Sequence, residues 1–218
     1  MKRSVVLLSG GLDSTVALAC AVRETLVVLC LTFDYGQRAA AREAAAAAAI
    51  ARHYGVPHRT VALPFLGEIT STALVNREAA VPAPDPRDLR NSTVAHQTAR
   101  AVWVPNRNGV FVNVAAAFAE ALGAGVVVAG LNREEGETFP DNSAAFVAAA
   151  NRALALSTLS GVKVVSYTQQ LDKAEIVALG RRLNIPWRLI WSCYHGDAAP
   201  CGRCESCLRL AGALEGAG

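Results

Sequence analysis

The sequence predicts an α/β fold in which a parallel β-sheet is covered by helices on both faces. Short apolar runs, typical of buried strands, alternate with longer stretches of helical composition along most of the chain. This alternation indicates βαβ units, which place their strands parallel in one sheet. The 218 residues suit one domain with a small appendage. We therefore expect a Rossmann-like sheet whose ligands bind at the carboxyl ends of the strands.

The first third of the chain supplies three expected strands and two expected helices. The strands are apolar or β-rich runs at 4–8, 26–33 and 58–63. A helix at 13–23 has apolar residues on one face, and an alanine-rich helix at 37–54 follows from propensity. Gly55 and Pro57 mark the end of this second helix.

Residues 64–101 interrupt the alternation. Prolines stand at positions 64, 82, 84 and 86 with polar residues between them, so we expect an irregular segment. Long structureless segments are uncommon inside a domain and are often functional lids. A surface excursion without a role is an equal alternative.

The alternation resumes after this segment. Helices are expected at 109–122, 142–159 and 172–183, and strands at 126–129 and 162–166. Beyond residue 190 the composition changes, because cysteine, glycine and proline become frequent. We therefore expect residues 1–190 to form the α/β domain and residues 191–218 to form a separate segment packed on it.

Charge and hydropathy narrow the possible functions. The formal net charge is only +3 and the arginines are scattered, so no basic face for direct nucleic-acid binding is expected. No apolar run reaches the roughly 18–20 residues that a membrane span requires. The apolar run after the basic start is too short for a signal peptide. We expect a cytoplasmic protein without a membrane partner.

The loop Ser9-Gly10-Gly11-Leu12-Asp13-Ser14 connects the first expected strand to the first expected helix. Glycines allow the backbone to approach an oxyanion, and free N–H groups at a helix start bind it. The Gly-Lys-Ser/Thr sequence of the Walker loop is absent, so another kind of phosphate loop is indicated. The alternative is a tight turn capped by Asp13.

This string resembles the PP-loop of ATP pyrophosphatases, which transfer AMP to a carboxylate or carbonyl oxygen and release pyrophosphate. The resemblance implies a sheet of the adenine-nucleotide alpha-hydrolase type. It also implies that Asp13 and Ser14 are catalytic and that Mg²⁺ accompanies ATP. The expected ATP-binding residues lie in this loop and at the end of the second strand: Leu8, Ser9, Gly10, Gly11, Leu12, Asp13, Ser14, Thr15, Phe33 and Asp34.

Four cysteines follow residue 190 in C-x7-C-x2-C-x2-C spacing: Cys193, Cys201, Cys204 and Cys207. Four thiolates suit one structural zinc ion with tetrahedral geometry. An iron–sulfur cluster and a redox-active pair of Cys204 and Cys207 are the alternatives. Because four protein ligands leave no open position, we expect the zinc to hold the segment near the active site rather than to do chemistry.

Further strings lie in a fixed order along the chain: Phe33-Asp34-Tyr35-Gly36-Gln37, Val104-Pro105-Asn106-Arg107-Asn108, Phe139-Pro140-Asp141, Leu171-Asp172-Lys173 and Trp191-Ser192-Cys193-Tyr194. Together with the loop, they resemble the 7-cyano-7-deazaguanine synthase (preQ0 synthase) family of the PP-loop superfamily. The resemblance runs from the first strand to the last cysteine and is weakest in residues 64–101.

The same strings supply the remaining expected site residues. Arg107 suits a carboxylate or phosphate clamp, with a solvated surface arginine as the alternative. Lys173 at a helix start is electrostatically unfavourable unless a phosphate lies nearby, or unless Glu175 pairs with it. Both are expected to be catalytic. Arg107, Asn108 and Asp141 are expected to bind the substrate, with Asp141 accepting guanine-like N–H donors or capping the next helix.

One position departs from the family pattern. Pro-Asp is usually followed by Cys-Arg in the family, whereas this chain has Asn142-Ser143. A thiol and a guanidinium are therefore absent from the expected substrate pocket. We expect the full conversion to be retained, with Asn142 capping the helix that it opens.

The resemblance implies an ATP-dependent carbon–nitrogen ligase that converts 7-carboxy-7-deazaguanine and ammonia into 7-cyano-7-deazaguanine, for queuosine or archaeosine in tRNA. It also implies a homodimer. An adenylating tRNA-modifying PP-loop enzyme and a relative that conjugates a deazaguanine to a protein are alternatives in the same fold. A zinc-knuckle protein that binds nucleic acid without catalysis is an alternative of another class.

Overall fold

The computed structural model describes residues 1–89 and 91–216. Within these residues, one five-stranded parallel sheet has the strand order β3-β2-β1-β4-β5. The predicted parallel sheet is therefore confirmed, with boundaries within two residues of those expected. Its strands are β1 (Arg3–Leu7), β2 (Leu26–Asp34), β3 (His58–Ala62), β4 (Val126–Val128) and β5 (Lys163–Val165).

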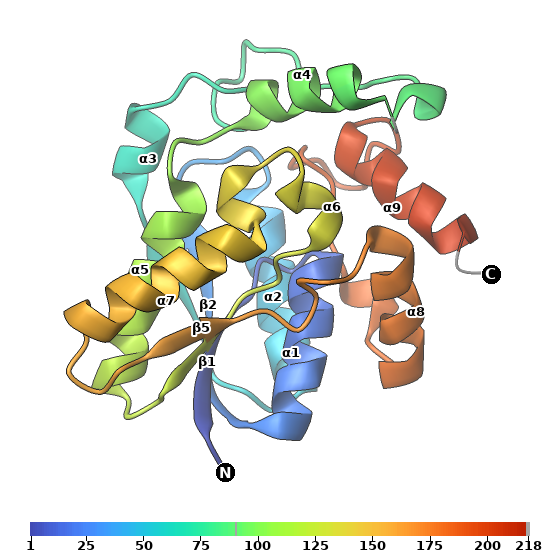
Figure 1. The fold of residues 1–218 in the computed structure, drawn as a ribbon. Helices are drawn as coiled ribbons and strands as arrows, with labels where there is room; N and C mark the ends of the chain where they lie inside the picture. Colours follow the sequence, from blue (N-terminus) through green and yellow to red (C-terminus); the bar gives the residue numbers. More distant parts are fainter. Residues whose placement is uncertain (90, 217–218) are drawn as a thin grey trace.

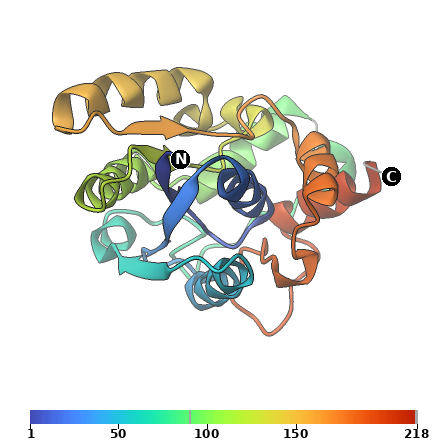
Figure 2. The ribbon, with the colours of Figure 1, turned by 90° about the horizontal axis from the view of Figure 1, so that it is seen from below.

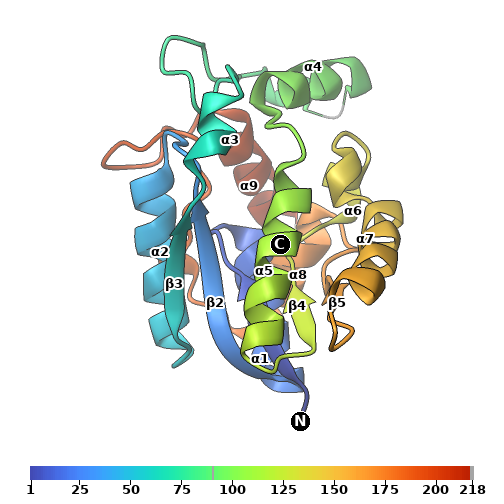
Figure 3. The ribbon, with the colours of Figure 1, turned by 90° about the vertical axis from the view of Figure 1, so that its left-hand side faces the viewer.

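Helices cover both faces of the sheet (Figures 1–3). On one face lie α1 (Leu12–Glu24) and α2 (Ala40–His53), and on the other lie α5 (Arg107–Ala121) and α7 (Ala144–Ser157). Each face of the sheet has its own hydrophobic core, and neighbouring residues of β1 pack into opposite cores. Val5 lies in the core with α5, and Val6 lies in the core with α1. Both side chains are fully buried, as the period of two in a strand requires.

The expectation of an irregular excursion at 64–101 is only partly correct. This segment contains α3 (Pro64–Glu68), the 3₁₀ turn η1 (Pro86–Asp88) and most of α4 (Ser92–Val102). Asn91 caps α4 by accepting hydrogen bonds from the first turn, a signal hidden by the prolines upstream. Figure 1 shows α4 across the end of the molecule opposite the N-terminus, on the side where α9 also lies.

Between β4 and the C-terminus the chain forms several further helical elements. They are α6 (Arg133–Gly136), η2 (Pro140–Asn142), α8 (Lys173–Leu183), η3 (Trp187–Leu189) and α9 (Glu205–Gly216). Ser143, not Asn142, caps α7, because its Oγ accepts from the Phe146 N–H at 3.1 Å. α8 starts with a capping box between Asp172 and Glu175, so Glu175 does not pair with Lys173.

The C-terminal segment packs against the sheet domain. Leu210 and Ala213 of α9 lie in an apolar cluster with Leu12 of α1 and Ile176 of α8. The Trp191 N–H donates to the Gly10 carbonyl at 2.9 Å, and the Glu205 N–H donates to the Pro82 carbonyl at 3.1 Å. Residues 217 and 218 of the expected 191–218 segment lie outside the described residues. No described helix is long and apolar enough to cross a membrane.

Candidate active site

The loop Ser9–Ser14 lies at the carboxyl end of β1 and leads directly into α1. Gly10 has a φ of 81°, and a Cβ there would lie 2.8 Å from the Ala46 Cβ of α2. Glycine is therefore required both by the backbone conformation and by the close approach of α2. Gly11, the N-cap of α1, has no side chain to cap the first turn of the helix, and its own N–H donates to the Ser9 Oγ at 3.4 Å. The loop has the features of an anion site.

The hydroxyls of the loop are oriented by the loop itself. The Ser14 Oγ lies 3.1 Å from the Ser9 Oγ and accepts from the Ser9 N–H at 3.2 Å. The Thr15 Oγ1 donates to the Gly11 carbonyl at 2.7 Å, which turns this side chain towards the helix. The Ser14 Oγ also donates to the Gly11 carbonyl, at 3.2 Å, so Ser14 and Thr15 both bond this carbonyl, and the Thr15 bond is the shorter one.

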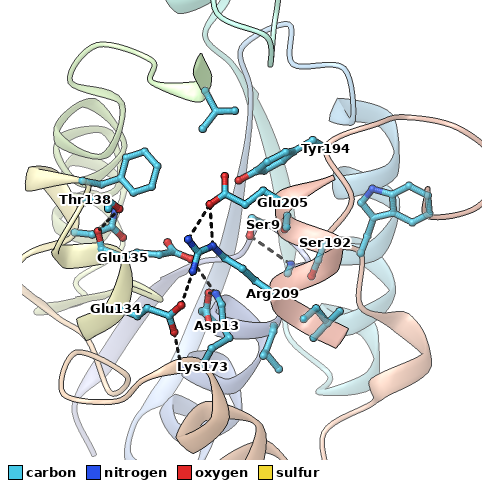
Figure 4. A pocket seen from close by; sticks show the side chains of 18 of the residues that line it. Ser9, Asp13, Glu134, Glu135, Thr138, Lys173, Ser192, Tyr194, Glu205 and Arg209 are labelled. Atoms are coloured by element: carbon cyan, nitrogen blue, oxygen red, sulfur yellow. Dashed lines mark hydrogen bonds and ion pairs between the residues drawn. The ribbon is translucent and has the colours of Figure 1, made fainter. Parts of the chain in front are cut away.

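Lys173 brings the start of α8 to the loop. Its Nζ lies 2.6 Å from Oδ2 of Asp13 and 2.9 Å from Oε1 of Glu135 (Figure 4). Burial lowers the pKa of the Lys173 ammonium, but these two carboxylates outweigh burial and raise it above its usual range. The carboxylates that pair with Lys173 are therefore Asp13 and Glu135, and not Glu175, which was the alternative to a bound phosphate. Oδ1 of Asp13 is buried and has no hydrogen-bond partner among the described residues.

A second ion-pair chain connects the loop to the C-terminal segment. Arg209 of α9 lies 2.6 Å from Oε1 of Glu134 and 2.8 Å from Oε1 of Glu205. The other oxygen of Glu134 accepts from the backbone N–H of Lys173 at 3.3 Å. In Figure 4, Arg209 reaches from α9 into the site between these two carboxylates. The C-terminal helix thereby forms part of the wall of the candidate site.

Arg107 stands at the start of α5. Its Nη1 donates to the Tyr35 hydroxyl at 3.1 Å, and the guanidinium lies 5.9 Å from the centre of the Tyr35 ring. Asn106 immediately before it has a φ of 52°, a left-handed conformation that asparagine tolerates. The exposed surface arginine that we held as the alternative is excluded, because Arg107 lines the cavities described next.

Two adjoining cavities meet at the loop. The strand-side cavity lies between the strand ends and α5, and apolar residues line it, among them Leu7, Leu8, Leu31, Phe33, Phe111 and Leu131. The tail-side cavity is bounded by α4, α6 and the C-terminal segment, including Val102, Phe139, Trp191, Tyr194, Glu205 and Arg209. Seven residues line both: Ser9, Gly11, Asp13, Glu43, Arg107, Glu135 and Asn142. The two cavities therefore share a wall of seven residues at the loop.

Most predicted site residues line one of these cavities. Leu8, Ser14, Phe33 and Asn108 line the strand-side cavity, whereas Leu12 and Lys173 line the tail-side cavity. Gly10, Thr15, Asp34 and Asp141 line neither. Asp34 accepts from the Gly36 N–H at 2.9 Å and so closes a turn.

Asp141 does not line either cavity, but it hydrogen-bonds the backbone at the start of α5. Its Oδ2 accepts from the backbone N–H of Asn108 at 3.1 Å, at the start of α5. It therefore caps α5 rather than the helix that follows it in sequence. Asp141 is buried, and burial raises the pKa of its carboxyl. The structure places this side chain where it positions Arg107 and Asn108.

Sequence reasoning missed several lining residues: Glu43, Glu134, Glu135, Glu205 and Arg209. Glu43 is the one acidic residue in the alanine-rich helix α2, which is the signal that marks it in the sequence. Glu205 and Arg209 are four residues apart and face the same side of α9, a spacing visible only once α9 is recognised.

The four cysteines expected to bind zinc lie together. All four sulfur atoms are within 4.8 Å of one another, as they must be for one ion to bind them. Tetrahedral zinc with Zn–S bonds of about 2.3 Å separates its sulfurs by about 3.8 Å, so the cluster fits this ion. Backbone N–H groups of His195 and Cys201 donate to the Cys193 Sγ, each at 3.4 Å. The cluster can bind a metal, and it carries α9 at its end.

A family model described as "Queuosine biosynthesis protein QueC" matches residues 3–218. The chain is 59% identical over 216 residues to a 7-cyano-7-deazaguanine synthase of Desulforudis audaxviator, covering 99% of this chain and 98% of that protein. It is 44% identical over 219 residues to a 7-cyano-7-deazaguanine synthase of Methanosarcina mazei, covering 99% and 95%.

Solved structures with a similar fold are more distant in sequence. An NMN synthetase from Francisella tularensis has a TM-score of 0.50 and 16% identity, covering 99% of this chain and 82% of that chain. A 4-thiouridine synthetase in a complex with RNA and bound ATP also has a TM-score of 0.50, at 18% identity, covering 99% and 50%. These structures share the fold of the present chain.

Proposed function

The chain belongs to the QueC family of queuosine biosynthesis proteins, a family of enzymes, and we propose that it converts 7-carboxy-7-deazaguanine, ammonia and ATP into 7-cyano-7-deazaguanine. The reaction class is carbon–nitrogen ligation in the route to queuosine or archaeosine. The observation that carries this proposal is the pair of cavities that meet at the loop Ser9–Ser14. They allow a nucleotide and a second flat ligand to bind next to each other.

The strand-side cavity suits the nucleotide. Its apolar walls match an adenine ring, and its end at Ser9, Gly11 and Ser14 offers amide and hydroxyl donors for phosphates. The tail-side cavity then takes the deazaguanine, between Phe139 and the aromatic residues of the C-terminal segment. Arg107 lines both cavities, so its guanidinium can hold the substrate carboxylate against the α-phosphate.

Activation by AMP makes the chemistry possible. A carboxylate is a poor electrophile because its leaving group would be oxide, whereas an acyl adenylate expels AMP. Ammonia attacks the adenylate to give an amide, and a second adenylation, on the amide oxygen, permits dehydration to the nitrile. The protein positions the reactants and stabilises charge on the phosphates with Lys173, Arg107 and the loop amides.

Mg²⁺ and zinc are the two metals implied. Oδ1 of Asp13, buried without a partner, and the carboxylate of Glu135 are oxygen donors at the place where pyrophosphate would lie. Mg²⁺ held there would neutralise charge on the phosphates. Zinc held by the four cysteines would be structural, since no coordination position remains open.

The nucleotide products test the proposal. With 7-carboxy-7-deazaguanine, ammonium and Mg²⁺, the protein should release AMP and pyrophosphate from ATP, and release should depend on the deazaguanine. Formation of ADP and phosphate would contradict the proposal. Release of AMP at the same rate with and without the deazaguanine would also contradict it. Replacing Asp13 or Ser14 by alanine should abolish AMP release while the fold, followed by circular dichroism, stays intact.

A further inference from the structure

Glu43 brings a carboxylate to the point where the two cavities meet, and the chemistry above gives it no task. It lies in the first turn of α2, the helix that packs on the loop. A Cβ on Gly10 would lie 3.0 Å from the Glu43 carbonyl oxygen, so the two segments are in direct contact. Glu43 is therefore held beside the loop by the backbone packing itself.

Glu43 differs from the other two carboxylates shared by both cavities. Lys173 neutralises Asp13 and Glu135 at 2.6 and 2.9 Å. Among the described residues, no lysine, arginine or histidine lies within ion-pair distance of Glu43. Arg107 also lines the junction, and its charge favours the ionised form of Glu43, but its guanidinium hydrogen-bonds Tyr35 rather than Glu43. The junction thus contains one carboxylate whose negative charge has no direct counter-ion.

Gln37 fixes the orientation of this carboxylate. The Gln37 Nε2 donates to Oε2 of Glu43 at 2.8 Å and to the Phe33 carbonyl at 3.0 Å, while its Oε1 accepts from the Tyr35 N–H at 2.9 Å. Gln37 is only 3% exposed, so it holds one oxygen of Glu43 rigidly. Oε1 of Glu43 has no partner among the described residues. Burial raises the pKa of the Glu43 carboxyl, which makes it a better proton acceptor than an exposed glutamate.

A small cation that carries a removable proton matches these features. At neutral pH ammonia exists almost entirely as ammonium, which cannot attack because its nitrogen has no lone pair. An unpaired carboxylate at the junction both attracts ammonium and accepts a proton from it. Ammonium is also small enough to reach the junction while a nucleotide and a deazaguanine occupy the two cavities.

We propose that Glu43 is a catalytic residue that binds ammonium and takes its proton, delivering ammonia to the adenylated carbon. This inference rests on the proposed function and deepens it. The ammonia lone pair forms the C–N bond, and the C–O bond to AMP breaks, so that AMP leaves with the electron pair. The adduct nitrogen loses a second proton to solvent, giving the neutral amide. Glu43 then returns its proton to solvent.

The test separates adenylation from attack by nitrogen in Glu43→Gln. Adenylation is followed by exchange of labelled pyrophosphate into ATP, which requires the deazaguanine but no ammonia. We expect exchange within about threefold of the wild type. Amide formation from ammonium should fall by about a hundredfold or more, the contribution typical of a general base. Glu68→Gln, which alters an exposed carboxylate on α3, is the matched control and should change neither rate.

Hydroxylamine supplies the discriminating readout. It is largely neutral at pH 7 and attacks without losing a proton first, so Glu43→Gln should form the hydroxamate at close to the wild-type rate. Glu43→Asp retains a carboxylate that is one methylene shorter and should show an intermediate rate with ammonium.

Three results would overturn the inference. Wild-type amide formation by Glu43→Gln would show that no base is required there. Loss of pyrophosphate exchange in this variant would assign Glu43 to nucleotide binding. Failure of hydroxylamine to restore product formation would mean that Glu43 positions the adenylate instead. If the wild-type protein itself shows no exchange, the proposed function fails and this inference fails with it.

Discussion

Lys173 is the side chain on which the charge balance of the site depends. Its side chain is 15% exposed, and its ammonium lies between Asp13 on α1 and Glu135 on α6. A helix start is an unfavourable place for a cation, and here two carboxylates rather than a bound phosphate offset that cost. The same ammonium would face the phosphates once ATP binds. It is therefore both a structural counter-ion and a candidate catalytic group.

Lys173→Met should lose both functions. Two partly buried carboxylates would be left without their cation, and we expect a decrease of about 3 kcal/mol in the free energy of unfolding. Substrate-dependent AMP release should fall by at least about a hundredfold. Urea unfolding and the AMP assay measure the two effects. Lys173→Arg is the control for charge and should recover most of the stability. Wild-type AMP release by Lys173→Met would contradict the catalytic role.

His58 makes the stability of the sheet edge depend on pH. It begins β3, and its Nε2 lies 2.7 Å from the buried Oγ1 of Thr32. Burial lowers the pKa of His58 below its usual 6.5. The unfolded chain therefore takes up a proton before the folded protein does. This contribution to stability is complete above about pH 6.5 and is lost as the pH falls below that value.

The comparison with His58→Gln isolates this effect, because glutamine can still hydrogen-bond Thr32 without titrating in this range. The melting temperature of the wild type relative to His58→Gln should fall as the pH decreases from 7.5 to about 5. The difference should be constant above pH 7. A melting temperature of the wild type that rises relative to His58→Gln as the pH decreases would mean that the pKa of His58 is raised instead.

At the residue scale, features that depend on adjacent residues could be recognised from the sequence, whereas contacts between residues far apart in the sequence could not. The loop Ser9–Ser14 was recognised because a strand, glycines and a helix start are adjacent in sequence. For Lys173 the sequence suggested a bound phosphate, with Glu175 as the alternative partner, and it did not suggest Asp13, which lies 160 residues away. Asp34 and Asp141 are expected to touch ligands, and in the structure one oxygen of each accepts from a backbone N–H group. Carboxylates near a site form such bonds as readily as ligand contacts, and sequence does not distinguish the two.

At the element scale, α9 links the cysteine cluster to the active site. It begins one residue after Cys204 and carries Cys207, and its next turn supplies Arg209, which ion-pairs with Glu134 of α6 at 2.6 Å. This helix was missed because the short segment between cysteines gives no apolar period. α6 was not predicted for the same reason, because its sequence shows no apolar periodicity. A metal bound by the cysteines would therefore be connected to the candidate site through one helix.

Metal removal should uncouple this helix from the site. We expect the purified protein to contain about one zinc per chain, and binding in such sites contributes about 10–16 kcal/mol. Cys204→Ser should release α9 and increase its proteolysis. It should also increase hydrolysis of the adenylate, so that more AMP is released per molecule of product. Cys20→Ser, outside the cluster, is the control.

Elemental analysis and limited proteolysis measure these effects. Iron in place of zinc would favour the iron–sulfur alternative. A fully active preparation without metal would show that the cluster does not support the site.

At the scale of the whole molecule, the carboxyl edge of the sheet gathers segments that are far apart in sequence. The loop after β1, the start of α5, the start of α8 and the C-terminal segment all line the same pair of cavities. Strand and helix alternation predicted this edge as the ligand site, because parallel strands end together. It did not predict that α4 and α9 would close over it, since their burial depends on tertiary contacts.

Asn142 and Ser143 stand where the family pattern has Cys-Arg, and this difference could affect the whole reaction. Asn142 is buried and lines both cavities, whereas Ser143 caps α7 and faces neither. No step in the proposed route requires a thiol, because AMP already activates the carbon. Loss of one charge-assisted hydrogen bond from the absent arginine costs only about 1.5–3 kcal/mol, a rate penalty of about ten- to a hundredfold. We therefore expect the full conversion.

The identity of the organic product tests the central claim most directly. The protein is incubated with 7-carboxy-7-deazaguanine, excess ATP, Mg²⁺ and ¹⁵N-labelled ammonium, and the products are followed by mass spectrometry. We predict that a labelled amide appears first and is then converted completely to the labelled nitrile, with two AMP released per nitrile. An end product that remains the amide, or an amide transferred to a protein amine, would contradict the account.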